Sequence, residues 1–154
     1  MKKIASPQNY GINLVSFTVV RESTTPRETI SAPSDVVRIG RALIPDDARE
    51  HFYLLLLNAQ NALVAAHHVS TGTLNASLVH SREVFGPALR VMGVASIVLV
   101  HNHPSGDATP SSEDLRLTEQ LVGGAKLLDL RIHDHVILGN GTDAWVSLAQ
   151  KGQL

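Results

Sequence analysis

The sequence contains no cysteine among its 154 residues. A disulfide framework, a thiolate metal site and a cysteine nucleophile are therefore all excluded. Zinc deaminases are excluded for the same reason, because they hold their metal with a histidine and a pair of cysteines. Any metal ion that this chain binds must be held by histidine or carboxylate side chains.

Aromatic residues are also scarce, at 4% of the chain, and the formal net charge is only -1. Proteins that bind single-stranded nucleic acids combine a basic groove with aromatic platforms, and the sequence has no stretch where the two alternate. The weak net charge gives no general attraction to a phosphate backbone. We therefore expect no direct binding of nucleic acids.

Long hydrophobic runs are missing as well. A membrane-spanning helix needs about 20 apolar residues, so no membrane span or membrane partner is expected. The N-terminal Met1-Lys2-Lys3-Ile4 has no apolar stretch behind it, so we expect no signal peptide and a cytoplasmic protein. The apolar content of 44% fits a folded chain of about one domain.

The spacing of apolar residues predicts alternating strands and helices. A continuous apolar run over 96–100 is typical of a strand that is covered on both faces. The sequence therefore predicts an α/β fold with a mixed sheet flanked by helices. The other expected elements are a strand over 12–20, a helix from Ser34-Asp35 that stops at Pro45, a hairpin over 50–69, a helix with Ser81 as its N-cap, a polar loop over 101–110, a helix over 112–128 weakened by Gly123-Gly124, a strand over 132–138, and a short strand or the start of a helix over 144–148.

Two histidines follow the buried strand at once. His101 and His103 are two positions apart, so in extended backbone their side chains point to the same face. Asp114 lies in the first turn of the next predicted helix. Two imidazoles and one carboxylate match the three protein ligands of a catalytic zinc site, which leaves one position open for water. The pattern predicts Zn2+ binding by these three residues.

Ser111 and Asp114 have a second interpretation. They match a capping box, in which a serine at the N-cap and an acid three residues later satisfy the first backbone N–H groups of a helix. Such a cap stabilises a helix with no metal present. The two interpretations are compatible, because an acid in the first turn can face both the helix end and a metal ion.

A further pair of histidines lies on the last long predicted strand. His133 and His135 flank Asp134, and alternate residues of a strand share a face, so a second metal site is conceivable there. A hydrogen-bonded Asp134–His135 pair without a metal is the favoured interpretation.

The ordered set of strand, His-x-His-Pro, loop and Ser-x-x-Asp resembles the JAMM motif of the JAB/MPN metallopeptidases. The run His-Asn-His-Pro-Ser-Gly over 101–106 is similar to the RadC-like branch in particular, as are the segments 81–85 and 134–137. The resemblance covers residues 31–154 and implies a single MPN/JAB-like domain there, with a cytidine-deaminase-like architecture. Residues 1–30 are then an N-terminal extension with one strand.

The resemblance also implies roles for individual residues. His101, His103 and Asp114 are the expected zinc ligands, and Ser111 is expected to hydrogen-bond the attacking water or the developing oxyanion. The family pattern needs an upstream glutamate as general base. Glu50 is favoured because it directly precedes an apolar strand. Glu83 is the alternative, although an acid in the first turn of a helix is expected from the helix dipole alone.

The activity implied by the resemblance is hydrolysis of an amide or isopeptide bond in a protein or peptide substrate. A non-catalytic MPN-type scaffold is one alternative, although such scaffolds usually lack ligands and none is missing here. A DNA-repair-associated protein without direct catalysis is another. Longer RadC proteins carry an N-terminal helix-hairpin-helix region, for which residues 1–30 are too short, so direct DNA binding has less support. The oligomeric state stays open, with a dimer as one option.

Overall fold

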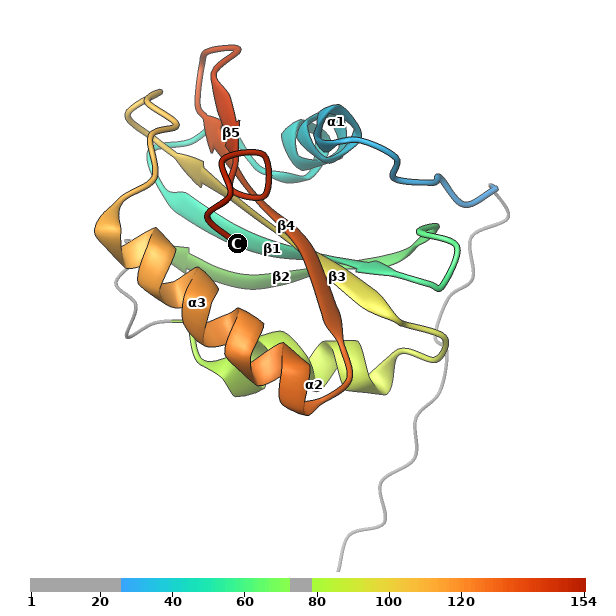
Figure 1. The fold of residues 1–154 in the computed structure, drawn as a ribbon. Coiled ribbons are helices and arrows are strands. Elements are labelled where there is room, and N and C mark those ends of the chain that lie inside the picture. Colours follow the sequence, from blue (N-terminus) through green and yellow to red (C-terminus); the bar gives the residue numbers. More distant parts are fainter. Residues whose placement is uncertain (1–25, 73–78) are drawn as a thin grey trace, which may run out of the picture.

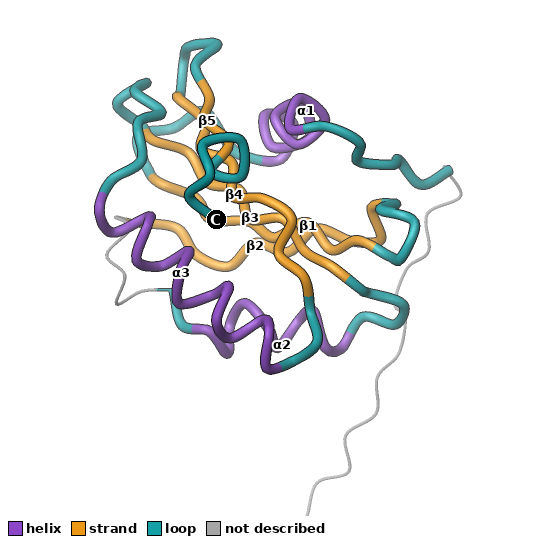
Figure 2. The backbone as a smooth tube through the Cα atoms, viewed as in Figure 1, coloured by secondary structure: helices purple, strands orange, loops and turns teal. Residues whose placement is uncertain are grey.

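The computed structural model describes residues 26–72 and 79–154, which form one sheet with helices on both faces (Figure 1, Figure 2). The strand expected over 12–20 lies outside the described residues, and the division at residue 30 stays a prediction. In chain order the elements are α1 (Pro33–Leu43), β1 (Glu50–Leu57), β2 (Leu63–Gly72), α2 (Ser81–Arg90), β3 (Ser96–His103), α3 (Ser112–Leu127), β4 (Arg131–Gly139) and β5 (Trp145–Ser147).

The sheet is mixed, with the strand order β2-β1-β3-β4-β5. The central pair β3 and β4 is parallel, and every other neighbouring pair is antiparallel. The predicted α/β fold with a mixed sheet is confirmed. None of the helices in the described ranges has both the length and the apolar character that crossing a membrane requires.

Strand β3 separates two hydrophobic cores. Ile97 and Leu99 point to the side of α2 and α3, where they pack with residues such as Leu121. Val98 and Val100 point to the other side, which α1 covers (Figure 1). All four strand residues are buried, so the expectation of a strand covered on both faces is confirmed. Side chains of this strand therefore alternate between two separate environments.

The strand does not stop where its apolar run stops, and the loop predicted over 101–110 is wrong for its first three residues. β3 continues through His103 because it has a partner on each side. β1 pairs with it up to Phe52 opposite His101, and β4 pairs with it up to Gly139 opposite His103. The polar composition suggested a loop, but hydrogen bonds to two neighbouring strands decide the backbone here.

The start of α2 also differs from the prediction. His80 is the N-cap and Ser81 is the first helical residue, with no capping hydrogen bond from a side chain. The hydroxyl of Ser81 instead accepts a hydrogen bond of 3.1 Å from Nε2 of Gln120 on α3. The serine thus links the two helices that cover the same face of the sheet, which local sequence patterns do not reveal.

The two glycines of α3 provide a test of how this helix packs. A methyl group at Gly123 meets nothing within 4 Å, so Gly123→Ala is expected to raise the free energy of unfolding by about 0.5–1 kcal/mol through lower backbone entropy. A methyl group at Gly124 lies 2.8 Å from Cε2 of Phe85, which is buried in α2. Gly124→Ala is therefore expected to lower the free energy of unfolding by about 1–3 kcal/mol. Urea denaturation measures both values, and equal effects at the two positions would contradict this packing.

Candidate metal centre

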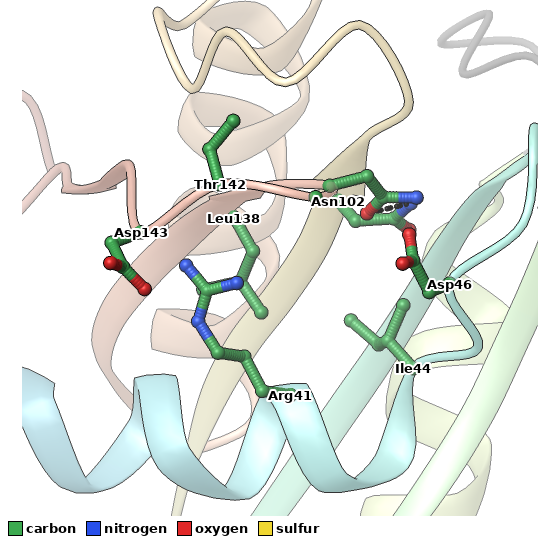
Figure 3. Close-up of a pocket in the computed structure, with 9 residues that line it drawn as sticks. Arg41, Ile44, Asp46, Asn102, Leu138, Thr142 and Asp143 are labelled. Atoms are coloured by element: carbon green, nitrogen blue, oxygen red, sulfur yellow. Dashed lines mark hydrogen bonds between the residues drawn. The ribbon is translucent and has the colours of Figure 1, made fainter.

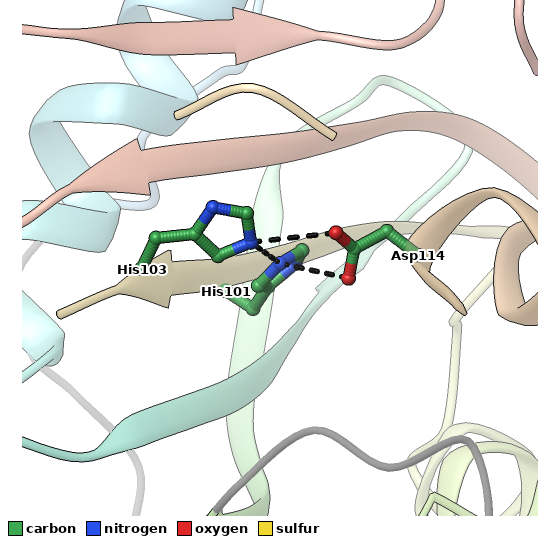
Figure 4. Close-up of side chains that lie close together, drawn as sticks. All are labelled: His101, His103 and Asp114. Atoms are coloured by element: carbon green, nitrogen blue, oxygen red, sulfur yellow. Dashed lines mark hydrogen bonds and ion pairs between the residues drawn. The ribbon is translucent and has the colours of Figure 1, made fainter. Parts of the chain in front are cut away.

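Three side chains from two elements converge at the carboxyl end of β3 (Figure 4). His101 and His103 come from the strand, and Asp114 comes from the first turn of α3. The Nε2 atoms of the two histidines are 3.0 Å apart. Nε2 of His101 is 3.2 Å from Oδ1 of Asp114, and Nε2 of His103 is 3.3 Å from Oδ2. His101 and Asp114 are fully buried.

The atoms that meet at this point are hydrogen-bond acceptors. The carboxylate of Asp114 has no proton, and Nδ1 of His103 donates to the backbone oxygen of Asp107 at 2.7 Å. A neutral His103 therefore presents a lone pair at Nε2. Such a group is stable only with a proton or a cation at its centre. Within the described residues, it is the one group of three or more potential ligands that could hold a metal ion.

The spacing of the three atoms fits a tetrahedral metal ion. Ligand atoms about 2.0–2.1 Å from a zinc ion lie roughly 3.3 Å from one another when they occupy tetrahedral directions. The three observed separations of 3.0, 3.2 and 3.3 Å are close to this value. The site therefore has both the donor atoms and the size that a metal ion of this kind needs.

The pKa values of the three groups follow from their burial and their contacts. Burial lowers the pKa of His101, and the carboxylate of Asp114 offsets only part of that effect. The hydrogen bond to Asp114 raises the pKa of His103 above 6.5. Burial opposes the charge of Asp114, but the hydrogen bonds to His101, His103 and Ser111 outweigh it and hold its pKa below the ordinary value. Without a metal ion, the proton of the cluster therefore belongs on His103.

Ser111 and Asp114 form the predicted capping box. Ser111 is the N-cap of α3, and its hydroxyl oxygen accepts from the backbone N–H of Asp114 at 3.2 Å. Oδ2 of Asp114 accepts from both the backbone N–H and the hydroxyl of Ser111, each at 2.7 Å. The same carboxylate faces the histidines, so the cap and the candidate ligand are one group. The two interpretations of this motif hold together.

The predicted general base Glu50 is the first residue of β1 and is half-buried. The register of β1 and β3 ends with Phe52 opposite His101, and Glu50 lies two residues before Phe52, on the same face of β1. Directly opposite residues of an antiparallel pair share a face of the sheet. Glu50 also raises the pKa of both His101 and His103, as expected for a carboxylate close to the two rings.

Asn102 lies between the two histidines and points to the other face of the sheet. Its Oδ1 accepts from the backbone N–H of His51 at 2.7 Å, and its Nδ2 donates to the backbone oxygen of Arg49 at 2.9 Å. One buried amide thus holds the chain on both sides of Glu50. Sequence patterns did not identify this contact, because it depends on the pairing of two strands that are far apart in the chain.

The face that Asn102 occupies carries a pocket of about 340 Å³ between α1 and the loop after β4 (Figure 3). Arg41 of α1 lines it and donates to the backbone oxygens of Gly139 and Ala144 at 3.5 and 3.3 Å. Asn140 lines it too, and its Oδ1 accepts from Nδ2 of Asn102 at 2.9 Å. Arg41, Asn102 and Asn140 therefore use their polar groups to hold the end of the sheet, and the candidate ligands face the opposite side.

The loop after β3 supports the second histidine. Gly106 has a φ of 82°, and its N–H donates to the backbone oxygen of His103 at 3.1 Å, which closes a tight turn. A Cβ atom on Gly139 would come within 2.1 Å of the backbone oxygen of Gly106. Only glycine at 139 lets β4 approach the loop this closely. The loop in turn presents the oxygen of Asp107 to Nδ1 of His103.

A third histidine contacts the candidate ligands. Nε2 of His135 on β4 is 2.7 Å from Nδ1 of His101, and Nδ1 of His135 is 2.6 Å from Oγ1 of Thr118 on α3. Thr118 was not identified from the sequence, although its position four residues after Asp114 puts both on one face of a helix.

The prediction that His133 and His135 share a face is wrong. β4 has an irregularity here: Ile97 pairs with Ile132, but the next residue Val98 pairs with Asp134, so His133 is skipped and the alternation is broken. The favoured Asp134–His135 pair exists only through the backbone, since Oδ1 of Asp134 accepts from the N–H of His135 at 2.7 Å.

Glu83, the alternative general base, lies on α2. Its side chain is exposed and accepts from Nε of Arg82 at 3.0 Å. Burial and the neighbouring His68 lower the pKa of His67, and Glu83 offsets part of that effect. Glu50, in contrast, is among the groups that raise the pKa of His101 and His103.

Metal binding is expected to displace the proton of His103. Because the hydrogen bond to Asp114 raises its pKa above 6.5, more than half of the rings are protonated at pH 6.5 and must lose that proton to offer Nε2 to a metal ion. Zinc titrations in two buffers of different ionisation enthalpy are expected to show release of about one proton at this pH, and the affinity is expected to rise with pH. His133→Gln, which changes a histidine outside the cluster, serves as control. Binding without proton release would contradict the assignment.

Sequence comparisons agree with this geometry. The family described as "RadC-like JAB domain" matches residues 30–153. The chain is 46% identical over 127 residues to a UPF0758 protein of Methanosarcina mazei, which covers 82% of this chain and 54% of that protein. It is 42% identical over 124 residues to a UPF0758 protein of Caldanaerobacter subterraneus subsp. tengcongensis, with 80% and 52% covered.

A UPF0758 protein of Staphylococcus haemolyticus is 44% identical over 123 residues, with 80% of this chain and 53% of that protein covered. The chain thus spans about half the length of the curated relatives that it matches. The names of these relatives state no activity. The family match extends over nearly all of the described residues and includes every member of the cluster at the end of β3. On these grounds the chain belongs to the RadC-like JAB domain family.

Proposed function

We propose that this domain is a zinc-dependent hydrolase that cleaves an amide or isopeptide bond in a protein or peptide. The observation that carries the proposal is the convergence of two ring nitrogens and a carboxylate within 3.3 Å, with a glutamate on the same face of the neighbouring strand. A zinc ion bound there supplies a Lewis acid and an activated water at neutral pH. Two nitrogens and one oxygen suit zinc better than magnesium or calcium.

In this proposal Glu50 is the general base. Its carboxylate takes a proton from the attacking water and passes it to the leaving amine, as positioned carboxylates do in general acid–base catalysis. Its place at the start of β1, two residues before the partner of His101, supports this role, and so does its influence on the pKa of both histidines. The exposed Glu83 on α2 has no comparable relation to the histidines.

Ser111 is proposed to stabilise the oxyanion that forms when the carbonyl is attacked. Its hydroxyl and its backbone N–H both donate to Oδ2 of Asp114. The hydroxyl can rotate toward a substrate while the N–H keeps Asp114 in place. A residue that is doubly bonded to the ligand can therefore serve the substrate without releasing the ligand.

Asn102 is proposed as the residue that positions Glu50. Its side chain binds the backbone of Arg49 and His51, the two neighbours of Glu50. The two neighbours of Asn102 itself, on β3, are candidate metal ligands. The base and the metal centre are thereby fixed to one rigid element. A displacement of about 1 Å at a reacting centre costs about a hundredfold in rate, so this connection matters to the proposed reaction.

Replacing the proposed base tests the catalytic interpretation against a scaffold that only binds metal. Glu50→Gln is expected to lower kcat by about a hundredfold to ten-thousandfold, since general base catalysis contributes that much. Zinc content is expected to stay unchanged because the three ligands remain. The measurement is hydrolysis of a panel of peptides and isopeptide-linked conjugates by zinc-loaded protein, together with elemental analysis.

Glu83→Gln is the matched control, because it makes the same chemical change on an exposed helix of the same domain. It is expected to leave hydrolysis at the wild-type rate. The catalytic proposal fails if zinc-loaded wild-type protein cleaves nothing in the panel, and the assignment of the base fails if Glu50→Gln is as active as Glu83→Gln.

The role of Asn102 has an isosteric test. Asn102→Asp keeps an acceptor for the N–H of His51 but sets a second carboxylate oxygen against the oxygens of Arg49 and Asn140, which now accept from Nδ2. We expect hydrolysis to fall by about tenfold to a hundredfold as Glu50 loses its fixed place. Zinc affinity should change little, because this side chain points away from the ligands.

Asn58→Asp is the control for this exchange. Asn58 lies in the turn between β1 and β2, and its Oδ1 accepts from the backbone N–H groups of Gln60 and Ala62 at 2.9 Å. An aspartate accepts the same bonds, so this variant is expected to behave as wild type. Wild-type activity in Asn102→Asp as well would show that Glu50 does not depend on the amide.

A further inference from the structure

Three buried side chains form a continuous series of hydrogen bonds behind the metal centre. Nδ1 of His101 is 2.7 Å from Nε2 of His135, and Nδ1 of His135 is 2.6 Å from Oγ1 of Thr118. Oγ1 of Thr118 is 2.6 Å from the backbone oxygen of Asp114. Each of the three side chains has 0% exposed surface, so water does not compete for these bonds. The series connects the backbone of one candidate ligand with the ring of another.

The direction of the series follows from counting protons. A backbone carbonyl oxygen only accepts, so the single hydroxyl proton of Thr118 is donated to Asp114. With its proton used, the Thr118 oxygen can only accept from His135. Nδ1 of His135 must therefore carry a proton. A neutral imidazole has one N–H, so Nε2 of His135 is left as an acceptor.

The same count then applies to His101. Since Nε2 of His135 accepts, Nδ1 of His101 must donate, and the remaining nitrogen of His101 bears the lone pair. That nitrogen is Nε2, which faces His103 and Asp114. The ring of His135 is fully buried and its two hydrogen-bond partners, His101 and Thr118, are not carboxylates, which favours the neutral form.

We propose that His135 and Thr118 are positioning residues that fix His101 as the Nδ1–H tautomer and so keep its Nε2 available for the metal ion. The inference rests on the proposed metal centre and deepens it. His103 needs no such series, because its Nδ1 meets a backbone oxygen that can only accept. His101 contacts His135, whose ring nitrogen could either donate or accept. The tautomer of His101 is therefore decided by Thr118, the next partner of His135.

The decisive role of Thr118 sets this inference apart from simple packing. In Thr118→Val nothing accepts from Nδ1 of His135, so that ring can turn to the Nε2–H form and donate to His101. His101 then carries its proton on Nε2 and cannot bind a metal ion without first exchanging it. Thr118→Ser keeps a hydroxyl that can donate and accept in the same way. The valine is close to threonine in shape, so a purely steric role predicts the opposite order.

The test combines two measurements on the whole chain. Nitrogen-15 NMR of the histidine rings, without metal and above pH 7, reports which nitrogen of His101 and His135 carries the proton. Competition with a chromophoric chelator gives the zinc dissociation constant. We expect Nδ1–H on both rings in the wild type, a mixture of tautomers in Thr118→Val, and a dissociation constant that is about 10–100 times larger in that variant. Thr118→Ser is expected to restore both properties.

His135→Leu and His133→Leu form a second pair on one strand. Removing His135 takes away the acceptor of His101 and is expected to weaken zinc binding about 10–100-fold, while His133→Leu leaves it unchanged. Where the valine or leucine variant does not fold, the tautomers of the wild-type protein decide. A proton on Nε2 of either His101 or His135 in the wild type overturns the inference.

The outcomes separate this inference from the proposed function. Equal zinc affinity and unchanged tautomers in Thr118→Val refute the role of Thr118, even if the protein hydrolyses its substrate. If the wild type binds no zinc, the proposed metal centre fails, and the role of this series in metal binding fails with it. Hydrolysis that is absent in a protein with tight zinc binding and the expected tautomers refutes only the proposed activity.

Discussion

The domain depends on one unfavourable arrangement: two ring nitrogens and a carboxylate that face each other within 3.3 Å. Without a proton or a cation between them, three acceptors in a buried site repel one another. The surrounding structure must therefore hold each group in place independently of the others. His103 is held by a loop carbonyl, Asp114 by the start of a helix, and His101 by a third histidine. The candidate metal centre therefore forms where the end of β3 meets the start of α3, and each of its three groups has its own support.

The sheet supplies most of this support. Because β3 has a partner on both sides, its polar end stays extended and both histidines project to one face. The residue between them serves the opposite face, where its amide holds β1 next to Glu50. Gly139 allows β4 to approach the loop that supports His103. Because side chains alternate along a strand, His101 and His103 face the candidate metal centre, and Asn102 between them holds the proposed base from the opposite face.

Much of this could be predicted from local patterns, and the limits have a physical cause. The spacing of His101 and His103 and the capping box at Asp114 are local features, so the sequence identified the cluster that the structure brings together. Thr118 was not recognised as its support, and the contact between His135 and His101 was not predicted, because these contacts depend on how α3 and β4 pack against β3. His133 was assigned to the wrong face because a single irregularity in β4 shifts the alternation, and no composition signal marks it. Local periodicity predicts elements, whereas pairing between distant segments decides which side chains meet.

The capping box shows that the geometry of one residue does not distinguish a structural role from a role in metal binding. Asp114 completes the helix start and also faces both histidines, so the same hydrogen bonds stabilise the fold and fix a candidate ligand. Retention of this residue is therefore expected in an enzyme and in a metal-binding scaffold alike. Glu50 differs, because it is neither part of the helix cap nor one of the three candidate ligands. It lies on the face of β1 that carries Phe52, the partner of His101, and it raises the pKa of both histidines. The case for catalysis therefore depends more on Glu50 than on the three candidate ligands. What matters is that its carboxylate can accept a proton, as a general base must.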